Sequence, residues 1–340
     1  MRASELLCPR PQGLYCPQAD LYIDPTRPVA RALITHGHSD HARAGHGCVM
    51  ATPETLAIMG VRYGDGFCAA QQALKYGERL QVNGVTFSLH PAGHVLGSAQ
   101  AAVESRGLRI VASGDYKRQG DPTCPGFEVV KCDVFISEAT FALPVFKHPC
   151  AEQEVRKLID SAALFPERAH LVGAYALGKA QRLMALMRQC GWTRPIFAHG
   201  ALMELTGLYQ EFGVNLGAVE QVGPAPKSFF AGAIVLCPPS ALQTPWSRRF
   251  PEPLNCFASG WMRTRARARQ QLVELPLVIS DHADWRDLTQ TIKDTEAGEV
   301  WITHGEAEAL AHWCKTQGLE AKALRLVGYG EEDEPANSGP

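Results

Sequence analysis

The densest group of reactive side chains in the sequence is the hexapeptide HGHSDH at residues 36–41. It holds three imidazoles and one carboxylate, and its small residues Gly37 and Ser39 let the backbone turn so that alternate side chains converge. Neutral imidazole and carboxylate are ligands that suit zinc and related transition ions, and a catalytic site leaves one coordination position open for water. The hexapeptide therefore predicts a metal site rather than isolated histidines of the surface or core.

Further groups of the same kind follow apolar stretches elsewhere in the chain. They are His94 in PAGHVLGSA, Asp115 in SGDYK and His304 in THGE. A single carboxylate such as Asp115 can bridge two ions about 3.5–4 Å apart, the spacing that suits in-line displacement at phosphorus. The number of ligands therefore predicts a binuclear site that takes two divalent metal ions, zinc or manganese.

The elements that must position these groups are short apolar runs rich in β-branched residues, which are typical of strands. Such runs, ARALIT and EVWIT among them, end at His36, His94, Asp115, Glu138, Asp281 with His282, and His304. Strand ends followed by loops are where sheet-based enzymes carry their sites. Amphipathic stretches of helical period lie between the runs, at residues 152–165, 178–190 and 305–317. The sequence therefore predicts an α/β fold.

Composition limits the class of protein. With 340 residues and 46% hydrophobic residues, the chain can form two compact units with ample cores. Its eleven cysteines are scattered and never form CxxC, which favours reduced thiols and a cytoplasmic location. No signal peptide or apolar run of about 18 residues is present, so we expect no membrane partner. The net charge of −2 means that any surface for a polyanion must be local.

The order HxHxDH, then a separate His, an Asp and a final His, resembles the metallo-β-lactamase superfamily. The resemblance implies an αββα sandwich with Asp115 bridging two metals. It further implies that His36, His38 and His94 hold one metal and that Asp40, which also takes part in catalysis, holds the other with His41 and His304. Asp24, which ends LYID, is similar to that fold's first motif, a residue that orients the ligand loop. Because the superfamily includes lactamases and thioester hydrolases, these motifs alone do not choose a substrate.

Three more motifs resemble those of the β-CASP nucleases: Glu138 in SEATF, His282 in SDHADW and His304 in THGE. The resemblance implies that His282 protonates the leaving oxygen and that Glu138 orients it and favours its charged form. In that family an inserted domain caps the metal site. We therefore expect metallo-β-lactamase segments at residues 1–150 and 263–328, a β-CASP cap at 151–262, and a disordered acidic tail at 329–340.

Closer still, EATF, GAYALGKAQRL, ASGWM and SDHADW resemble the bacterial ligase-associated DNA exonucleases. The resemblance implies a DNA exonuclease of DNA repair, which prefers DNA over RNA and has a DNA ligase and a helicase of the same pathway as partners. In GAYALGKAQRL, Lys179 begins a predicted helix at a point where an anion could sit. In RTRARAR, permanently charged guanidinium groups could bind phosphate bidentately, all from one side if the segment is extended. We therefore expect Lys179, Arg263 and Arg265 to contact substrate phosphates.

Three other functions compete with this interpretation. An RNA-processing endo- or exonuclease of the same fold would carry the same motifs, and the residues do not separate DNA from RNA. A thioester or lactam hydrolase would need neither the cap nor His282. A non-catalytic nucleic-acid-binding subunit would typically have lost metal ligands, whereas this sequence keeps the whole predicted set.

Overall fold

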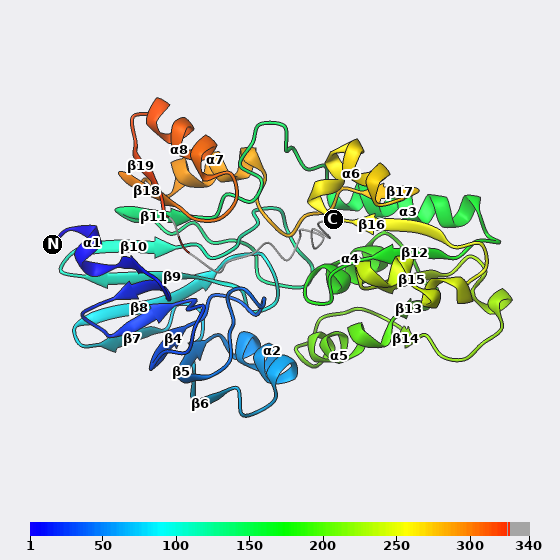
Figure 1. Ribbon diagram of the computed structural model, residues 1–340, viewed down its shortest axis with the longest axis horizontal. Helices are drawn as coiled ribbons and strands as arrows, with labels where there is room; N and C mark the ends of the chain where they lie inside the picture. Colours follow the sequence, from blue (N-terminus) through cyan, green and yellow to red (C-terminus); the bar gives the residue numbers. More distant parts are fainter. Residues whose placement is uncertain (325, 327–340) are drawn as a thin grey trace. The chain divides into compact units, whose positions relative to one another are not determined.

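The computed structural model describes residues 1–324 and 326 (Figure 1). The chain divides into two compact units. Within the described residues, the first unit consists of residues 1–147, 282–324 and 326, and the second of residues 148–281. The sequence analysis placed the second boundary earlier, at 262/263. It lies later because β17 (Leu275–Leu277) pairs in parallel with β16 (Leu254–Ala258) and so extends the sheet of the second unit. The predicted tail at 329–340 lies outside the described residues.

The first unit contains two sheets. One has the order β1-β2-β3-β4-β5-β6, and the other the order β19-β18-β11-β10-β9-β8-β7. The strands of the first sheet are β1 (Cys8–Arg10), β2 (Gly13–Cys16), β3 (Leu21–Ile23), β4 (Arg31–Leu33), β5 (His46–Ala51) and β6 (Cys68–Ala73). Those of the second are β7 (Arg79–Val82), β8 (Val85–Pro91), β9 (Ala99–Ser105), β10 (Leu108–Ala112), β11 (Val134–Ser137), β18 (Glu299–Ile302) and β19 (Glu320–Ala323).

The two sheets of the first unit pack face to face. One buried cluster joins Leu14, Ile23 and Leu33 of the first sheet to Phe87, Val103 and Ile136 of the second. The outer face of the second sheet is covered by α7 (Trp285–Asp294) and α8 (Ala307–Thr316), drawn together in orange in Figure 1. Helix α2 (Pro53–Tyr63) covers the outer face of the first sheet. Helices and sheets therefore form four layers, with one core between the sheets and one under each helical layer. The short α1 (Ala3–Leu6) precedes β1.

The second unit is built on one parallel sheet with the order β14-β13-β15-β12-β16-β17. Its remaining strands are β12 (His170–Gly173), β13 (Ile196–Ala198), β14 (Val219–Gln221) and β15 (Ile234–Cys237). Its helices are α3 (Ala151–Leu164), α4 (Lys179–Gln189), α5 (Met203–Glu211) and α6 (Arg265–Gln270). Short 3-10 turns cover Gly200–Leu202, Lys227–Phe230, Pro239–Gln243, Pro245–Arg249 and Gly260–Arg263. All pairings are parallel, which fits the fully buried apolar runs of β12 and β15.

Two further properties bear on the sequence-based expectations. Every cysteine of the chain is a free thiol. Among the described residues, none of the helices combines the length and the apolar character needed to cross a bilayer.

Candidate metal centre

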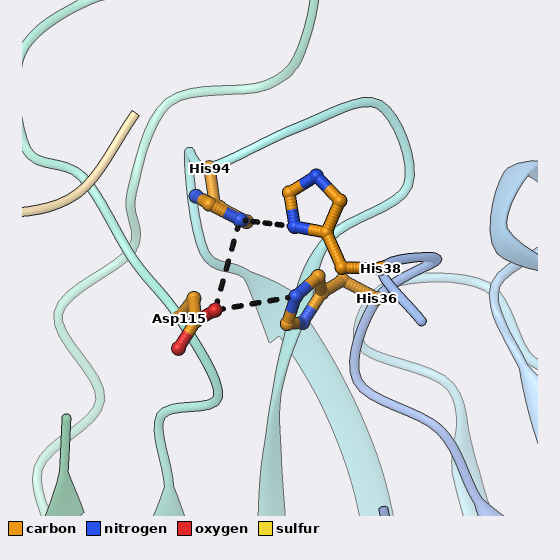
Figure 2. A group of neighbouring side chains, drawn as sticks. All are labelled: His36, His38, His94 and Asp115. Atoms are coloured by element: carbon orange, nitrogen blue, oxygen red, sulfur yellow. Dashed lines mark hydrogen bonds and ion pairs between the residues drawn. The ribbon is translucent and has the colours of Figure 1, made fainter. Parts of the chain in front are cut away.

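The predicted ligands of the hexapeptide and of three distant loops meet in the first unit. Nε2 of His36 lies 3.4 Å from Oδ2 of Asp115, and Nε2 of His41 lies 3.5 Å from the same oxygen. Nε2 of His94 is 3.9 Å from that oxygen and 3.0 Å from Nδ1 of His38 (Figure 2). One carboxylate oxygen therefore has imidazole nitrogens of three histidines around it, two from the hexapeptide and one from the loop of His94, which is the arrangement expected of a bridging ligand.

The ligand atoms form overlapping groups, each lying within 4.8 Å, that share Asp115, His36 or His41. One group holds His36, His38, His94 and Asp115; a second holds His36, Asp40 and His41; a third holds His41, Asp115 and His304. These groups contain all seven residues that the sequence analysis named as ligands. His36, His38, His41, His94 and Asp115 are buried, so these nitrogens and oxygens have left bulk water.

Asp24 contacts both ends of the hexapeptide region, through Thr35 and through His41. Its carboxylate accepts hydrogen bonds from the backbone N–H of Thr35 at 2.7 Å, from the Thr35 hydroxyl at 2.6 Å and from Nδ1 of His41 at 2.8 Å. Donation by Nδ1 leaves Nε2 of His41 as the nitrogen that faces Asp115. Asp24 lies next to the hexapeptide, and its backbone has a positive φ of 45°.

Two threonines that the sequence analysis did not single out favour one tautomer in each of two predicted ligands, His36 and His304. The hydroxyl of Thr35 donates to Asp24, so its oxygen can accept a hydrogen bond from Nδ1 of His36, 3.1 Å away. The hydroxyl of Thr303 donates to the carbonyl of Ser137 and likewise lies 3.1 Å from Nδ1 of His304. Protonation of Nδ1 leaves the Nε2 lone pair for the site. The signal was present in the sequence, because the tetrapeptide ITHG occurs at both 34–37 and 302–305.

The electrostatics of the cluster favour neutral imidazoles at three positions. Burial, reinforced by the neighbouring His41, lowers the pKa of His36 and that of His304 to about 4 each. Burial also lowers the pKa of His94 well below its usual value. At His41, burial acts in the same direction, but the carboxylates of Asp40, Asp115 and Asp24 outweigh it and raise the pKa to about 10. Burial would raise the pKa of Asp115, but His41 and His282 hold it well below its usual range.

These donors fit two divalent ions. Most of the side chains are buried, their donor atoms are carboxylate oxygens and imidazole nitrogens, and Nδ1 of His36, His41 and His304 has a backing hydrogen bond. His41 is the imidazole whose proton the neighbouring carboxylates retain, and a bound cation would have to displace that proton. A cluster of imidazoles and carboxylates so close together is costly to bury without a cation to share. Borderline ions such as zinc accept this mixture of nitrogen and oxygen ligands.

Glu138 and His282 stand together beside this cluster. Glu138, which is fully buried, accepts from Nδ1 of His282 at 2.9 Å and from the backbone N–H of Tyr116 at 2.8 Å. Asp115, Glu138 and His282 also offer ligand atoms within 4.8 Å of one another. The His282 ring contacts that of His94, with centroids 4.7 Å apart. Because Nδ1 contacts Glu138, Nε2 is the ring nitrogen that does not face that carboxylate.

The predicted phosphate contacts lie in the second unit and differ from one another. Lys179 is buried, and its ammonium lies 3.2 Å from the carboxylate of Asp281. Arg263 and Arg265 are exposed. The Arg run is not extended, because residues 265–270 form α6, and so its arginines spread around a helix. Arg267 stacks on Trp261, with its guanidinium carbon 3.9 Å from the ring centroid.

No family model matches the sequence. Its relatives include the cleavage and polyadenylation specificity factor subunit 3 of Dictyostelium discoideum, 29% identical over 49% of this chain and 26% of that protein. Endoribonuclease YSH1 of Saccharomyces cerevisiae is 34% identical over 34% of this chain and 15% of its own length. The chain is a homologue of the β-CASP nucleases of the metallo-β-lactamase fold.

A further relative, a probable DNA ligase of Opitutus terrae, is 27% identical and covers 92% of this chain. The chain spans 30% of that ligase, so it corresponds to less than a third of each of these three relatives. Among solved structures, a protein of unknown function from Enterococcus faecalis V583 shares the fold, with a TM-score of 0.54 and 14% identity. That likeness covers 80% of this chain and 74% of the other.

Proposed function

We propose that this chain is a two-metal phosphodiesterase that degrades DNA from an end during DNA repair. The observation that carries the proposal is the Glu138–His282 pair next to the ligand cluster, because a thioester or lactam hydrolase needs no acid for a poor alkoxide leaving group. The match to a probable DNA ligase over 92% of the chain supports DNA as the substrate. It also supports a DNA ligase as a partner, whereas a helicase of the same pathway is proposed on the family resemblance alone.

The architecture fits this proposal. The four layers of the first unit correspond to an αββα metallo-β-lactamase sandwich, and the second unit, inserted between Lys147 and His282, corresponds to a β-CASP cap. The chain's free cysteines support a reducing compartment, the cytoplasm. Arg263 and Arg265 are the exposed cations that we assign to backbone phosphates.

The proposed roles divide between a metal set and an acid. His36, His38 and His94 would hold one ion, Asp40, His41 and His304 the other, and Asp115 would be shared. When bound there, two divalent ions, zinc or manganese, would supply a nucleophile at neutral pH and would neutralise charge on the phosphate oxygens. His282 donates the proton on Nε2 to the departing sugar oxygen. Glu138 accepts a hydrogen bond from Nδ1, which keeps that nitrogen protonated and fixes the orientation of the ring. Asp24 and the two threonines keep the ligand rings oriented.

A second candidate is an RNA-processing nuclease of the same fold. It is favoured by the endoribonuclease of Saccharomyces cerevisiae, which matches 34% of this chain. Those matches are confined to parts of the chain, whereas the probable DNA ligase matches nearly all of it. We therefore propose DNA rather than RNA as the substrate.

End-labelled single- and double-stranded DNA and RNA, incubated in parallel with zinc or manganese, test the proposal directly. We expect stepwise shortening of DNA from one end and slower or no loss of RNA. Preferential internal cutting of RNA would favour the second candidate. Hydrolysis of thioesters or lactams without cleavage of any oligonucleotide would refute the proposal. Fewer than one metal ion per chain after supplementation would indicate a non-catalytic subunit.

A further inference from the structure

We propose that Lys179 and Arg182 are positioning residues that hold Asp281 and thereby fix the chain immediately before His282. This inference rests on the proposed function, because it concerns the delivery of the acid of that same site. It assigns Lys179 a role different from the phosphate contact expected from the sequence.

The cluster lies at the carboxyl edge of the parallel sheet in the second unit. Helix α4 begins shortly after β12, and residues 280–281 follow β17, two strands away in the same sheet. Lys179 and Arg182 are one turn apart on α4 and therefore point to the same side. The sheet topology thus brings two cations of one helix to the segment that leads into His282.

We call the contacts of Lys179 and Arg182 with Asp281 the clamp. Nζ of Lys179 lies 3.2 Å from Oδ2 of Asp281, and Nη1 of Arg182 lies 3.1 Å from Oδ1. Arg182 also donates to the carbonyl of Ser280. Each carboxylate oxygen of Asp281 is thus engaged by a different cation, and the backbone before it is held as well.

Burial makes this arrangement rigid. Lys179 and Arg182 are each 1% exposed and Asp281 is 3% exposed. A buried charge that loses its partner is strongly destabilised, so the cluster has few alternative arrangements. A surface triad of the same residues would be screened and mobile and could not hold the chain.

The other side of His282 is fixed within the first unit. The backbone N–H of Ala283 donates to the carbonyl of Tyr116 at 2.7 Å, and the backbone N–H of Tyr116 donates to Glu138. The chain passes from the second unit to the first at the peptide bond between Asp281 and His282. The residue before His282 is therefore held by α4 within the second unit, and the residue after it is held by Tyr116 within the first. Loss of the α4 anchor would free the ring to leave the position from which it donates its proton.

The test compares two substrates in the full-length protein loaded with manganese. The first is an oligonucleotide with an ordinary phosphodiester, whose leaving sugar oxygen needs a proton. The second is a nitrophenyl ester of a nucleotide, whose phenolate leaves unaided. We expect Arg182→Met to lower kcat on DNA by about 10- to 100-fold, the range for a misplaced catalytic group, with little change in KM. Activity on the nitrophenyl ester and metal content should stay within about threefold of the parent protein.

Two milder variants keep the test decisive if Arg182→Met folds poorly. Asp281→Asn retains the shape but loses the charge, and should show the same selective loss. Arg182→Lys retains the charge and should restore most of the activity on DNA. Arg156→Gln serves as a matched control, because it removes an exposed cation from α3 of the same unit, and should change neither activity.

Three results would overturn the inference. Equal losses on both substrates would mean that the cluster merely supports the fold or the metals. Weaker DNA binding with a shallower salt dependence and an unchanged kcat would show that Lys179 and Arg182 instead contact substrate phosphates. Unchanged kinetics in all variants would show that His282 is held without the clamp. In each case a leaving-group-dependent loss in His282→Ala keeps the proposed function standing, whereas an inactive parent protein refutes that function first.

Discussion

Replacement of His282 by alanine is the most direct test of its proposed role as the proton donor. The ring contacts Glu138 through Nδ1 at 2.9 Å and lies against His94, but none of the sequence-based ligand assignments includes it. The substitution removes the Nε2–H donor and leaves the seven assigned ligands in place. We therefore expect intact metal content together with a defect in the chemical step.

The size of the defect follows from what the ring supplies. Proton transfer by a positioned side chain contributes about 10²- to 10⁴-fold to a rate. At 1.36 kcal/mol for each factor of ten, this corresponds to about 2.7–5.4 kcal/mol of transition-state stabilisation. Because Glu138 already holds the ring in one orientation, little of that contribution is spent on ordering it, and we expect a loss near the upper half of the range. The loss should appear in kcat and kcat/KM alike.

The assay measures the same variant on an oligonucleotide and on a nitrophenyl ester of a nucleotide. Phenolate leaves without a proton, so the variant should lose less than about tenfold on the ester. His312→Ala is the matched control, since His312 is an exposed histidine on α8 and should leave both rates unchanged. Metal analysis of every preparation separates a chemical defect from loss of ions.

Equal losses on the two substrates would refute the reasoning. His282 would then position the phosphate or support the metals, as the proximity of Asp115, Glu138 and His282 would allow. Glu138 would lose its assigned role with it. A Glu138→Gln variant that behaves like His282→Ala on both substrates would lead to the same conclusion.

Three further predictions test the ligands, the basic segment and the fold. Asp115→Ala should abolish cleavage and lower the content of both metals. Loss of a residue that only hydrogen-bonds to a metal ligand costs about 10- to 100-fold in metal affinity, and Asp115 is placed to contact both ions itself. Elemental analysis that still finds two ions per chain would contradict this prediction. Arg263→Ala and Arg265→Ala should each weaken DNA binding and make log Kd less steep in log salt by about 0.7–0.9, and an unchanged slope in titrations would make them ordinary surface residues. Burial lowers the pKa of His170 to about 4 from 6.5, so the unfolded chain takes up that proton first and folding stability falls as pH drops from about 6.5 towards 4. His170→Gln should flatten that part of a denaturation profile, and an identical pH dependence in both proteins would refute it.

The strands that carry the ligands could be predicted because burial on both faces leaves an unbroken apolar run. VFIS of β11 is buried at every position and is followed at once by Glu138. The same holds for the end of β18 before Thr303 and His304. Strand β6 lacked such a signal, because its residues are mostly exposed and its pairing with β5 depends on the parallel neighbour rather than on its own pattern. Period and burial thus identify interior strands far better than edge strands.

The clamp around Asp281 was beyond sequence analysis for a different reason. The partners Arg182 and Asp281 are 99 residues apart, and only the order of strands in the parallel sheet brings them together. A lysine at the start of a helix looked like an exposed anion contact, and the sequence contains nothing that signals its burial. The compact second unit extends past the predicted boundary at 262/263 for the same reason, since β17 belongs to it only through pairing with β16.

The repeated tetrapeptide ITHG shows how identical local sequence is given different geometry by its surroundings. In both copies the threonine hydroxyl meets Nδ1 of the following histidine. In the second copy, however, His304 and Gly305 adopt positive φ angles of 58° and 52°, and a Cβ at Gly305 would lie 2.2 Å from the carbonyl oxygen of Ala139. Only glycine lets the chain pass so close to the residue after Glu138. The second copy therefore has two structural roles. It places His304 beside His41 and Asp115, and it packs directly against the end of β11, where Glu138 contacts His282.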